Sequence, residues 1–293
     1  MAGIYVNDKG TWKLPKSVWV KSGTWRVCKN VYVKQGGSWR ELIKTVDITS
    51  NKNNFNLYSY LGSPSQPLSV VVNIASNVTI GSSGPTLPQW CPYYCATTRK
   101  NLPKRPPAFT VGNFPTGSTV IINNNGYISG GGGYGGAGGN SFSKGPRYPY
   151  ELDGSNGGDG GDGIVKGSSR NFEISIVNTG TIAGGGGGGG GGRSYFIPST
   201  GQWSPGGNSS GGNGGDGAGV TGYSKTQGGS SSTNQNNYDK GIDGGQGGAI
   251  GQNGQAGQAP ASQYRNGAGG KAGKAIGSGI SIAVSGNIDG GIG

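Results

Sequence analysis

The most regular pattern in the chain is an alternation of β-branched and polar residues that recurs four times. Each copy continues through an Asn, Ser or Gly turn into a second short apolar piece that contains Ile, and then into glycine or serine. The copies are VVVNIASNVTIGSS (70–83), TVIINNNGYISGGG (119–132), EISIVNTGTIAGGG (173–186) and ISIAVSGNIDGGIG (280–293). A period of two is typical of β-strands, and Asn and Gly tolerate the positive φ of a tight hairpin or a solenoid-like corner. The recurrence predicts that these strands form layers of one core, from which the glycine segments leave in a common direction.

A shorter repeat occupies the N-terminus. IYVNDKGTWKLPKS, VWVKSGTWRVCKN and VYVKQGGSWREL each combine an alternating strand, a Gly turn, and Thr or Ser followed by Trp12, Trp25 or Trp39 and a basic residue. Each unit predicts a β-hairpin. The tryptophans either pack between neighbouring hairpins, which we favour, or form a platform for a ligand. Three units of ~13 residues are too small to stand alone, so we expect them to dock on a partner or to self-associate.

Glycine recurs with a period of three in the second half of the chain. In GGGGYGGAGG it falls at 130, 133, 136 and 139, and GSNGGDGGDG (154–163) and GGNGGDGAG (211–219) show the same spacing. A polyproline II-type helix has three residues per turn and a rise of about 3.1 Å, so every third residue lies on one edge. With glycine alone on that edge, neighbouring helices approach until their backbone amides and carbonyls form hydrogen bonds. A bundle of about six such helices offsets an ordering cost that an isolated run does not.

Nine consecutive glycines, Gly184 to Gly192, form the longest run. Fixing them costs on the order of 9 to 18 kcal/mol, at roughly 1 to 2 kcal/mol per residue. We predict that the run takes the most enclosed position of the bundle, where all three edges face neighbours and no side chain is tolerated. A flexible linker is the alternative. A collagen triple helix, which needs a long strict Gly-X-Y repeat, and a nucleotide-binding loop, which needs a following helix, do not fit.

These patterns together predict a mainly β protein with a bundle of polyglycine II helices and little or no α-helix. The chain has 293 residues with 67 glycines, which concentrate after about residue 126. We expect a tryptophan hairpin module over residues 1–46, a β-rich domain over 47–125, and a glycine-rich bundle with exposed loops over 126–293. Since no apolar run has the length of a signal peptide or a membrane span, we expect a soluble chain without membrane insertion.

Charge and residue types restrict the chemistry. The formal net charge is +12, but no nucleic-acid-binding module or Arg-Gly-Gly series accompanies it, so we expect no nucleic-acid partner. The absence of histidine excludes Ser-His-Asp and Cys-His catalysis and His-based metal sites. Asp159 and Asp162 lie in glycine triplets at positions expected to face solvent, and we predict no enzyme, metal or cofactor. Cys91 and Cys95 in WCPYYC form a disulfide or pack as thiols, and the odd cysteine count favours thiols.

The segments between the glycine runs are polar, rich in turns, and carry one to three aromatic residues each. They are NSFSKGPRYPYELD (140–153), RSYFIPSTGQWSPGGNSS (193–210), VTGYSKTQGGSSSTNQNNYDK (220–240) and QAPASQYRN (258–266). Tyr and Trp among Ser, Gly and Asn are typical of recognition loops on a rigid scaffold, although such aromatics can also simply cap the bundle ends. The candidate binding residues are Tyr148, Tyr150, Tyr195, Phe196, Trp203, Tyr223, Tyr238 and Tyr264.

A resemblance to a known group of proteins follows from these motifs. The VYVKQGGSWRE unit and the series VNIASNVTIGSS, STVIINNNGYISGGGGYGGAGG and TIAGGGGGGGGG resemble the glycine-rich domains of tailed-bacteriophage structural proteins, especially tail fibre and tail-tip proteins. The glycine-helix sandwich also resembles the adhesins at the tips of long tail fibres of T-even-like phages, which present variable loops to a bacterial receptor. The resemblance covers most of residues 1–139 and 172–192. It departs at the N-terminus, where the tryptophan hairpins replace the usual fibre-attachment domain.

The resemblance implies a virion protein that is assembled in the host cytoplasm and acts outside the cell. Residues 1–46 would then bind other virion proteins, and the aromatic loops would bind a bacterial surface receptor, either a saccharide or an outer-membrane protein. A homotrimer is compatible with the resemblance, because fibres are often trimeric, but no heptad or strict triple-helix repeat requires one. The alternative is a purely architectural subunit, either a capsid decoration or an extracellular filament protein, without a receptor role.

Overall fold

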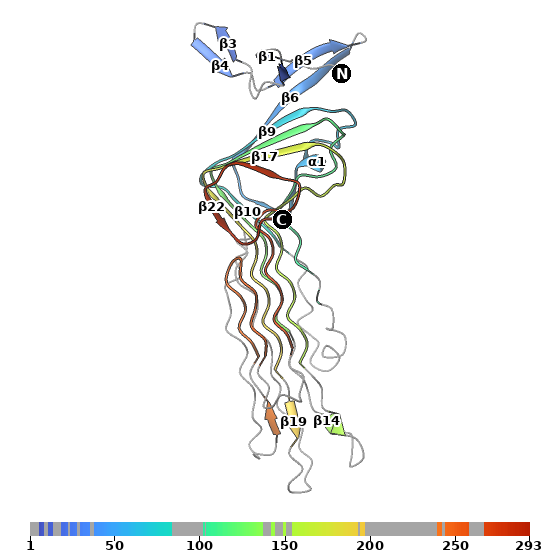
Figure 1. Cartoon of the computed structure of the whole chain (residues 1–293), viewed down its shortest axis with the longest axis vertical. Coiled ribbons are helices and arrows are strands. Elements are labelled where there is room, and N and C mark those ends of the chain that lie inside the picture. The colour runs from blue at the N-terminus through green and yellow to red at the C-terminus, as the bar shows by residue number, and fades with distance from the viewer. Residues whose placement is uncertain are drawn as a thin grey trace.

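The structure is a computed structural model with three parts along its longest axis: N-terminal hairpins, a body of β-sheets and a long bundle of extended rods (Figure 1). It describes in full residues 43–83, 102, 104–136, 154–192, 244–257 and 267–293. It also describes the backbone of the N-terminal strands within residues 6–42 and of four short strands at 142–143, 149–150, 194–196 and 239–241.

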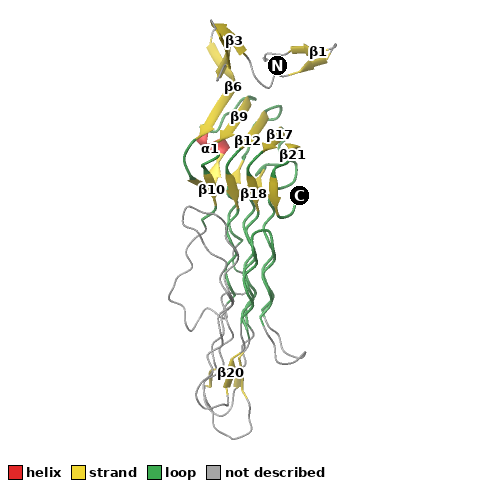
Figure 2. Ribbon diagram, turned by 90° about the vertical axis from the view of Figure 1, so that its left-hand side faces the viewer, coloured by secondary structure: helices red, strands yellow, loops and turns green. Residues whose placement is uncertain are grey.

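The body is a parallel β-solenoid built from three sheets (Figure 2). The strands of the six-stranded sheet lie in the order β21-β17-β12-β9-β6-β5, those of the five-stranded sheet in the order β22-β18-β13-β10-β7, and those of the three-stranded sheet in the order β16-β11-β8. Every neighbouring pair is parallel except β5 with β6. Successive coils of the chain therefore add one strand to each sheet in turn.

The strand bounds follow the recurring sequence pattern. The long strands of the six-stranded sheet are β6 (Ser38–Ile48), β9 (Ser69–Ile74), β12 (Thr119–Asn124), β17 (Glu173–Asn178) and β21 (Ser281–Val284). The strands that follow them in the five-stranded sheet are β7 (Lys52–Asn53), β10 (Thr79–Gly81), β13 (Tyr127–Ser129), β18 (Thr181–Ala183) and β22 (Asn287–Asp289). The third sheet consists of β8 (Phe55–Asn56), β11 (Phe109–Thr110) and β16 (Ile164–Val165), and single bridges extend it to Ile276 and Ile292.

The recurring strands stack in register and fill one core. Val72, Ile122 and Ile176 lie opposite one another on neighbouring strands, and all three are fully buried. In β9, β12 and β17 the alternation therefore points every second side chain into the core, and most of these inward side chains are apolar. This confirms the prediction that the four copies form layers of one core, and the parallel pairing selects the solenoid corner over the hairpin.

Buried asparagines continue the stack at the corner after the long strands. Asn124 and Asn178 are fully buried, and Asn124 Nδ2 donates to Asn178 Oδ1 over 2.8 Å. The Asn124 Oδ1 atom accepts from Gly126 N over 3.1 Å, so the same side chain also holds the turn into β13. These bonds satisfy polar atoms that would otherwise be buried without partners in the core.

Replacing Asn124 by alanine is expected to lower the free energy of unfolding by about 2 kcal/mol, because Asn178 Oδ1 and Gly126 N lose a hydrogen bond inside the protein. Asn123 is the matched control, since its amide donates to Asn73 Oδ1 at a part-buried position. We expect Asn123→Ala to cost within about 0.5 kcal/mol. Chemical denaturation measures both variants, and equal losses would contradict a special role for the inner asparagines.

The N-terminal part consists of three antiparallel hairpins, as the repeat predicts. They pair β1 (Val6–Asp8) with β2 (Thr11–Lys13), β3 (Trp19–Ser22) with β4 (Thr24–Val27), and β5 (Asn30–Gln35) with the first half of β6. Trp12, Trp25 and Trp39 each lie in the second strand of a hairpin. The packing of their side chains lies outside the described residues.

Strand β6 joins the hairpins to the solenoid. Its first half pairs antiparallel with β5, and its second half pairs parallel with β9 from Ile43 to Ile48. Within the solenoid, β12 and β17 lie side by side although they come from the two sides of residue 125. The predicted division into units at 1–46, 47–125 and 126–293 remains a prediction about which parts of the chain fold independently.

Helix contributes almost nothing to the part of the chain that the structure describes. Its one helix there, α1 (Leu57–Tyr60), has four residues and is capped by Asn56, whose side chain accepts from Ser59 N over 3.0 Å. The predicted fold class, mainly β with little or no α-helix, is confirmed. Among these residues no helix has the length and apolar character needed to cross a membrane.

Candidate functional site

In the part of the chain that the structure describes, six glycine-rich rods extend from the solenoid in one direction (Figures 1 and 2), and the glycine repeat at 211–219 lies outside that part. In chain order they are residues 130–136, 154–163, 184–192, 244–250, 251–257 and 267–275. The rods 130–136 and 184–192 directly follow β13 and β18, whereas the rod 154–163 leads back into β16. The prediction that the glycine segments leave the core together is therefore confirmed.

Backbone hydrogen bonds join the rods at every third residue. Rod 130–136 donates to Ala183 at the end of β18 through Gly130, and to rod 184–192 through Gly133 to Gly186 and Gly136 to Gly189, over 3.0, 2.8 and 2.8 Å. Rod 184–192 donates to rod 154–163 through Gly185 to Gly161, Gly188 to Gly158 and Gly191 to Ser155, over 2.8, 2.9 and 2.9 Å. Three residues per repeat is the period expected of polyglycine II-type helices. The free energy of these regular hydrogen bonds offsets the conformational entropy that the glycines lose when the rods become ordered.

The nine-glycine rod lies at the centre of this bundle. All of Gly184 to Gly192 are buried, and hydrogen bonds join the rod to each of the other five. A Cβ atom added at Gly184, Gly187 or Gly190 would lie 1.9 Å from a carbonyl oxygen of rod 267–275. At Gly185, Gly188 and Gly189 it would lie within 2.0 Å of carbonyl oxygens in other rods. The predicted enclosed position is confirmed, and the flexible-linker alternative is wrong.

A buried arginine secures the bundle where it meets the solenoid. Arg105 is 6% exposed, its Nε donates to Gly132 O over 2.9 Å, and its guanidinium lies 3.8 Å from the centre of the Tyr134 ring. The backbone around it runs beside rod 154–163, since Arg105 N donates to Asp159 O and Ala108 N donates to Asp162 O. The returning segment 104–108 thus covers the base of the rods with a cation–π contact and a charge-assisted hydrogen bond.

Short strands lie at the far end of the rods, opposite the hairpins (Figures 1 and 2). They form two antiparallel pairs, β14 (Phe142–Ser143) with β15 (Pro149–Tyr150) and β19 (Ser194–Phe196) with β20 (Asp239–Gly241). Rigid rods thus hold two hairpin-like pairs at the distal end of the molecule. We call this end, with its four strands, the distal tip.

The structure places three of the eight predicted binding residues at the distal tip. Tyr150 lies in β15, and Tyr195 and Phe196 lie in β19. Phe142, which the sequence reasoning did not select although it shares the loop segment 140–153, lies opposite Tyr150 in the β14–β15 pair. The remaining candidates lie outside the described residues, as do both WCPYYC cysteines: Tyr148, Trp203, Tyr223, Tyr238, Tyr264, Cys91 and Cys95.

Comparison with known proteins identifies the family to which this chain belongs. The family model for the phage tail fibre adhesin Gp38 matches residues 43–293. The chain belongs to this family. The adhesin is therefore a component of a phage tail fibre with a receptor-binding role, as the sequence motifs predicted. The match begins at Ile43, the residue at which β6 starts to pair with β9, so it spans the solenoid, the rods and the distal tip.

One solved structure to which the chain is similar is the crystal structure of the gp37-gp38 adhesin tip complex of the bacteriophage S16 long tail fiber. The similarity covers 87% of the adhesin and 83% of that chain, with 23% sequence identity and a TM-score of 0.45. No curated protein sequence matches the adhesin. In the described residues no group of three or more His, Cys, Asp or Glu side chains lies close enough to hold a metal ion.

Proposed function

We propose that this adhesin binds its bacterial receptor through aromatic residues at the distal tip. The observation that carries the proposal is the placement of the strands with Tyr150, Tyr195 and Phe196 at the end of the rods opposite the N-terminal hairpins (Figure 1). The loop candidates Tyr148, Trp203, Tyr223, Tyr238 and Tyr264 belong to the same proposed site, because each lies in a segment that joins two rods. The receptor is a saccharide or an outer-membrane protein.

Rigid display explains why so much glycine serves a binding protein. Ordering a loop at the moment of binding lowers affinity, whereas a loop that is already fixed avoids that cost. The central rod is hydrogen-bonded to five neighbours, so it holds β19 at a defined place before the receptor arrives. Aromatic side chains on such a support offer large contact areas with few torsions to restrict.

The hairpins of residues 1–46 are the proposed attachment region. They carry Trp12, Trp25 and Trp39 at equivalent positions, and most of them lie outside the part that the family model matches. We propose another tail fibre protein as their partner, the kind of protein with which the S16 adhesin forms its complex. A homotrimer stays a prediction, and the number of adhesin copies on the assembled fibre tests it. The proposal includes no catalytic step, metal or cofactor.

Alanine at three tip positions tests the receptor role. We expect phage particles that carry Tyr150→Ala, Tyr195→Ala and Phe196→Ala together to adsorb to host cells at least about tenfold more slowly, because a few aromatic residues supply most of the energy of such interfaces. Particle yield and adhesin content should stay unchanged. Tyr60→Ala is the matched control, since Tyr60 is 60% exposed on the body. Failed assembly with normal adsorption of the particles that do form would instead support the architectural alternative.

A further inference from the structure

Three Asx residues of rod 154–163 form a regular set of contacts with rod 267–275. Asn156, Asp159 and Asp162 are spaced by three, and each is followed by glycine. Their Oδ1 atoms accept hydrogen bonds from the backbone amides of Ala268, Lys271 and Lys274, over 2.9, 2.8 and 2.7 Å. The glycine after each Asx donates to the carbonyl oxygen of the same partner residue, with Gly157, Gly160 and Gly163 over 2.8, 2.9 and 2.8 Å. Each Asx-Gly pair therefore closes a two-bond ring on the neighbouring rod.

The partner rod lies at the outer edge of the bundle. Its buried glycines Gly267, Gly270 and Gly273 donate to the central rod, whereas Ala268, Lys271 and Lys274 are exposed. The amide of Ala272 also finds a side-chain acceptor, because it donates to Asn253 Oδ1 over 2.8 Å. Amides on the inner side of this rod thus bond to backbone, and the outer amides of Ala268, Lys271, Ala272 and Lys274 bond to Asx side chains.

An open edge of a glycine bundle presents the same hazard as an open edge of a β-sheet. At an edge without capping side chains, the outward amides have no partner. They are spaced by three residues or about 9 Å, which matches the carbonyl spacing of any further glycine rod. A second copy of this adhesin carries such rods. We propose that Asn156, Asp159, Asp162 and Asn253 close this edge: their oxygens replace the carbonyls of an absent rod, and so they prevent a rod of a second copy from adding to the bundle.

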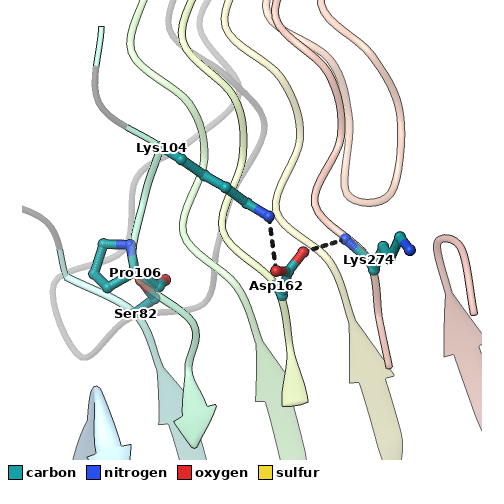
Figure 3. Close-up of polar contacts among 5 residues, drawn as sticks. All are labelled: Ser82, Lys104, Pro106, Asp162 and Lys274. Atoms are coloured by element: carbon teal, nitrogen blue, oxygen red, sulfur yellow. Dashed lines mark hydrogen bonds and ion pairs between the residues drawn. The ribbon is translucent and has the colours of Figure 1, made fainter. Parts of the chain in front are cut away.

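Asp162 also forms an ion pair with Lys104, and the effect of this pair must be distinguished from the closure of the bundle edge. Its Oδ2 lies 2.7 Å from Lys104 Nζ, while its Oδ1 accepts from the Lys274 amide (Figure 3). The Lys104 side chain is 50% exposed, so solvent screens the ion pair and it contributes little. An Asp→Asn change keeps the Oδ1 acceptor and removes the charge, whereas Asp→Ala removes both. The two changes therefore distinguish edge closure from charge pairing.

The test compares N156A/D159A/D162A/N253A with D159N/D162N in the full-length adhesin. In the alanine variant we expect amide exchange at Ala268, Lys271, Ala272 and Lys274 to accelerate about tenfold or more. We also expect sedimentation to show association that grows with protein concentration. The asparagine variant and K104Q should keep both the slow exchange and the sedimentation of the unaltered adhesin.

Single substitution guards against a variant that fails to fold. D159A removes only the middle acceptor, so we expect faster exchange at Lys271 while Ala268 and Lys274 stay protected. Unchanged exchange at Lys271 would show that the side chain is not the acceptor in solution and would overturn the proposal. Equal association in the D159N/D162N variant would assign the effect to lost charge and would overturn it as well. Faster exchange in the alanine variant without any association would refute the role of this edge as a latent docking surface.

Discussion

Alanine in place of Gly188 is expected to unfold the glycine bundle and to abolish host adsorption. The new Cβ would lie 1.9 Å from Tyr134 O and 2.5 Å from Tyr134 C, far inside van der Waals contact. Overpacking is usually relieved by small shifts of side chains, but here the neighbours are backbone on every side of the rod. We expect a loss of about 4 kcal/mol or more in the free energy of unfolding, which thermal denaturation measures.

Gly291 is the matched control for this substitution. An added Cβ there has only Lys274 Cγ nearby, at 3.9 Å, and Gly291 is not among the glycines with positive φ. We expect Gly291→Ala to change the free energy of unfolding by no more than about 0.5 kcal/mol and to leave adsorption intact. If the Gly188→Ala adhesin has the same melting temperature as the unaltered protein, the rods are not packed in solution as they are in this structure.

Local patterns predicted the elements of this fold because each depends on residues close in the chain. The period of two identified the strands around Val72, Ile122 and Ile176, and the period of three identified the rods. The same patterns could not decide between a hairpin and a solenoid corner. Both use Asn and Gly in the turn, and the difference lies in pairing across about 50 residues, as between Val120 and Ile174.

The candidate site shows the same division between local and distant information. Aromatic residues in polar loops predict a binding site at the rod ends, because a loop between two rods must emerge there, and the site stays a prediction. Asp159 and Asp162 were expected simply to face solvent, yet each accepts a hydrogen bond from a backbone amide 112 residues away, and Asp162 is only 16% exposed. Nothing near these residues in the chain indicates which rod lies beside them. The close packing of the bundle, rather than their own sequence context, determines their role.

The solenoid and the bundle depend on each other in a way that suits a protruding adhesin. Ile164 and Ile276 bridge in the third sheet, and the rods that lead into them are joined by the bond from Gly163 N to Lys274 O. The apolar core therefore holds the rods in place at their base, and glycine contacts continue this alignment toward the tip. Hydrophobic burial supplies stability in the body, whereas close backbone approach supplies stiffness in the rods.

Replacing residues 197–238 by Asn-Gly is expected to remove adsorption while leaving the scaffold folded. Phe196 and Asp239 form the last residue pair between β19 and β20, so a two-residue type I′ turn can join them without disturbing either strand. The change deletes the proposed binding residues Trp203, Tyr223 and Tyr238 together with the glycine repeat 211–219, and it keeps the six described rods and the hydrogen bonds among them. We expect adsorption to fall about a hundredfold or more, with a melting temperature within a few degrees of the unaltered adhesin.

Amide exchange in the central rod shows whether this variant loses receptor binding alone or loses the scaffold as well. If the scaffold persists, the amides of Gly185, Gly188 and Gly191 keep their acceptors in rod 154–163 and exchange as slowly as in the unaltered adhesin. Slow exchange with lost adsorption then assigns receptor binding to the deleted segment, because the support that remains is the same. Slow exchange with full adsorption would exclude Trp203, Tyr223 and Tyr238 from the receptor site and leave the other proposed residues, Tyr148, Tyr150, Tyr195, Phe196 and Tyr264, as its aromatic surface.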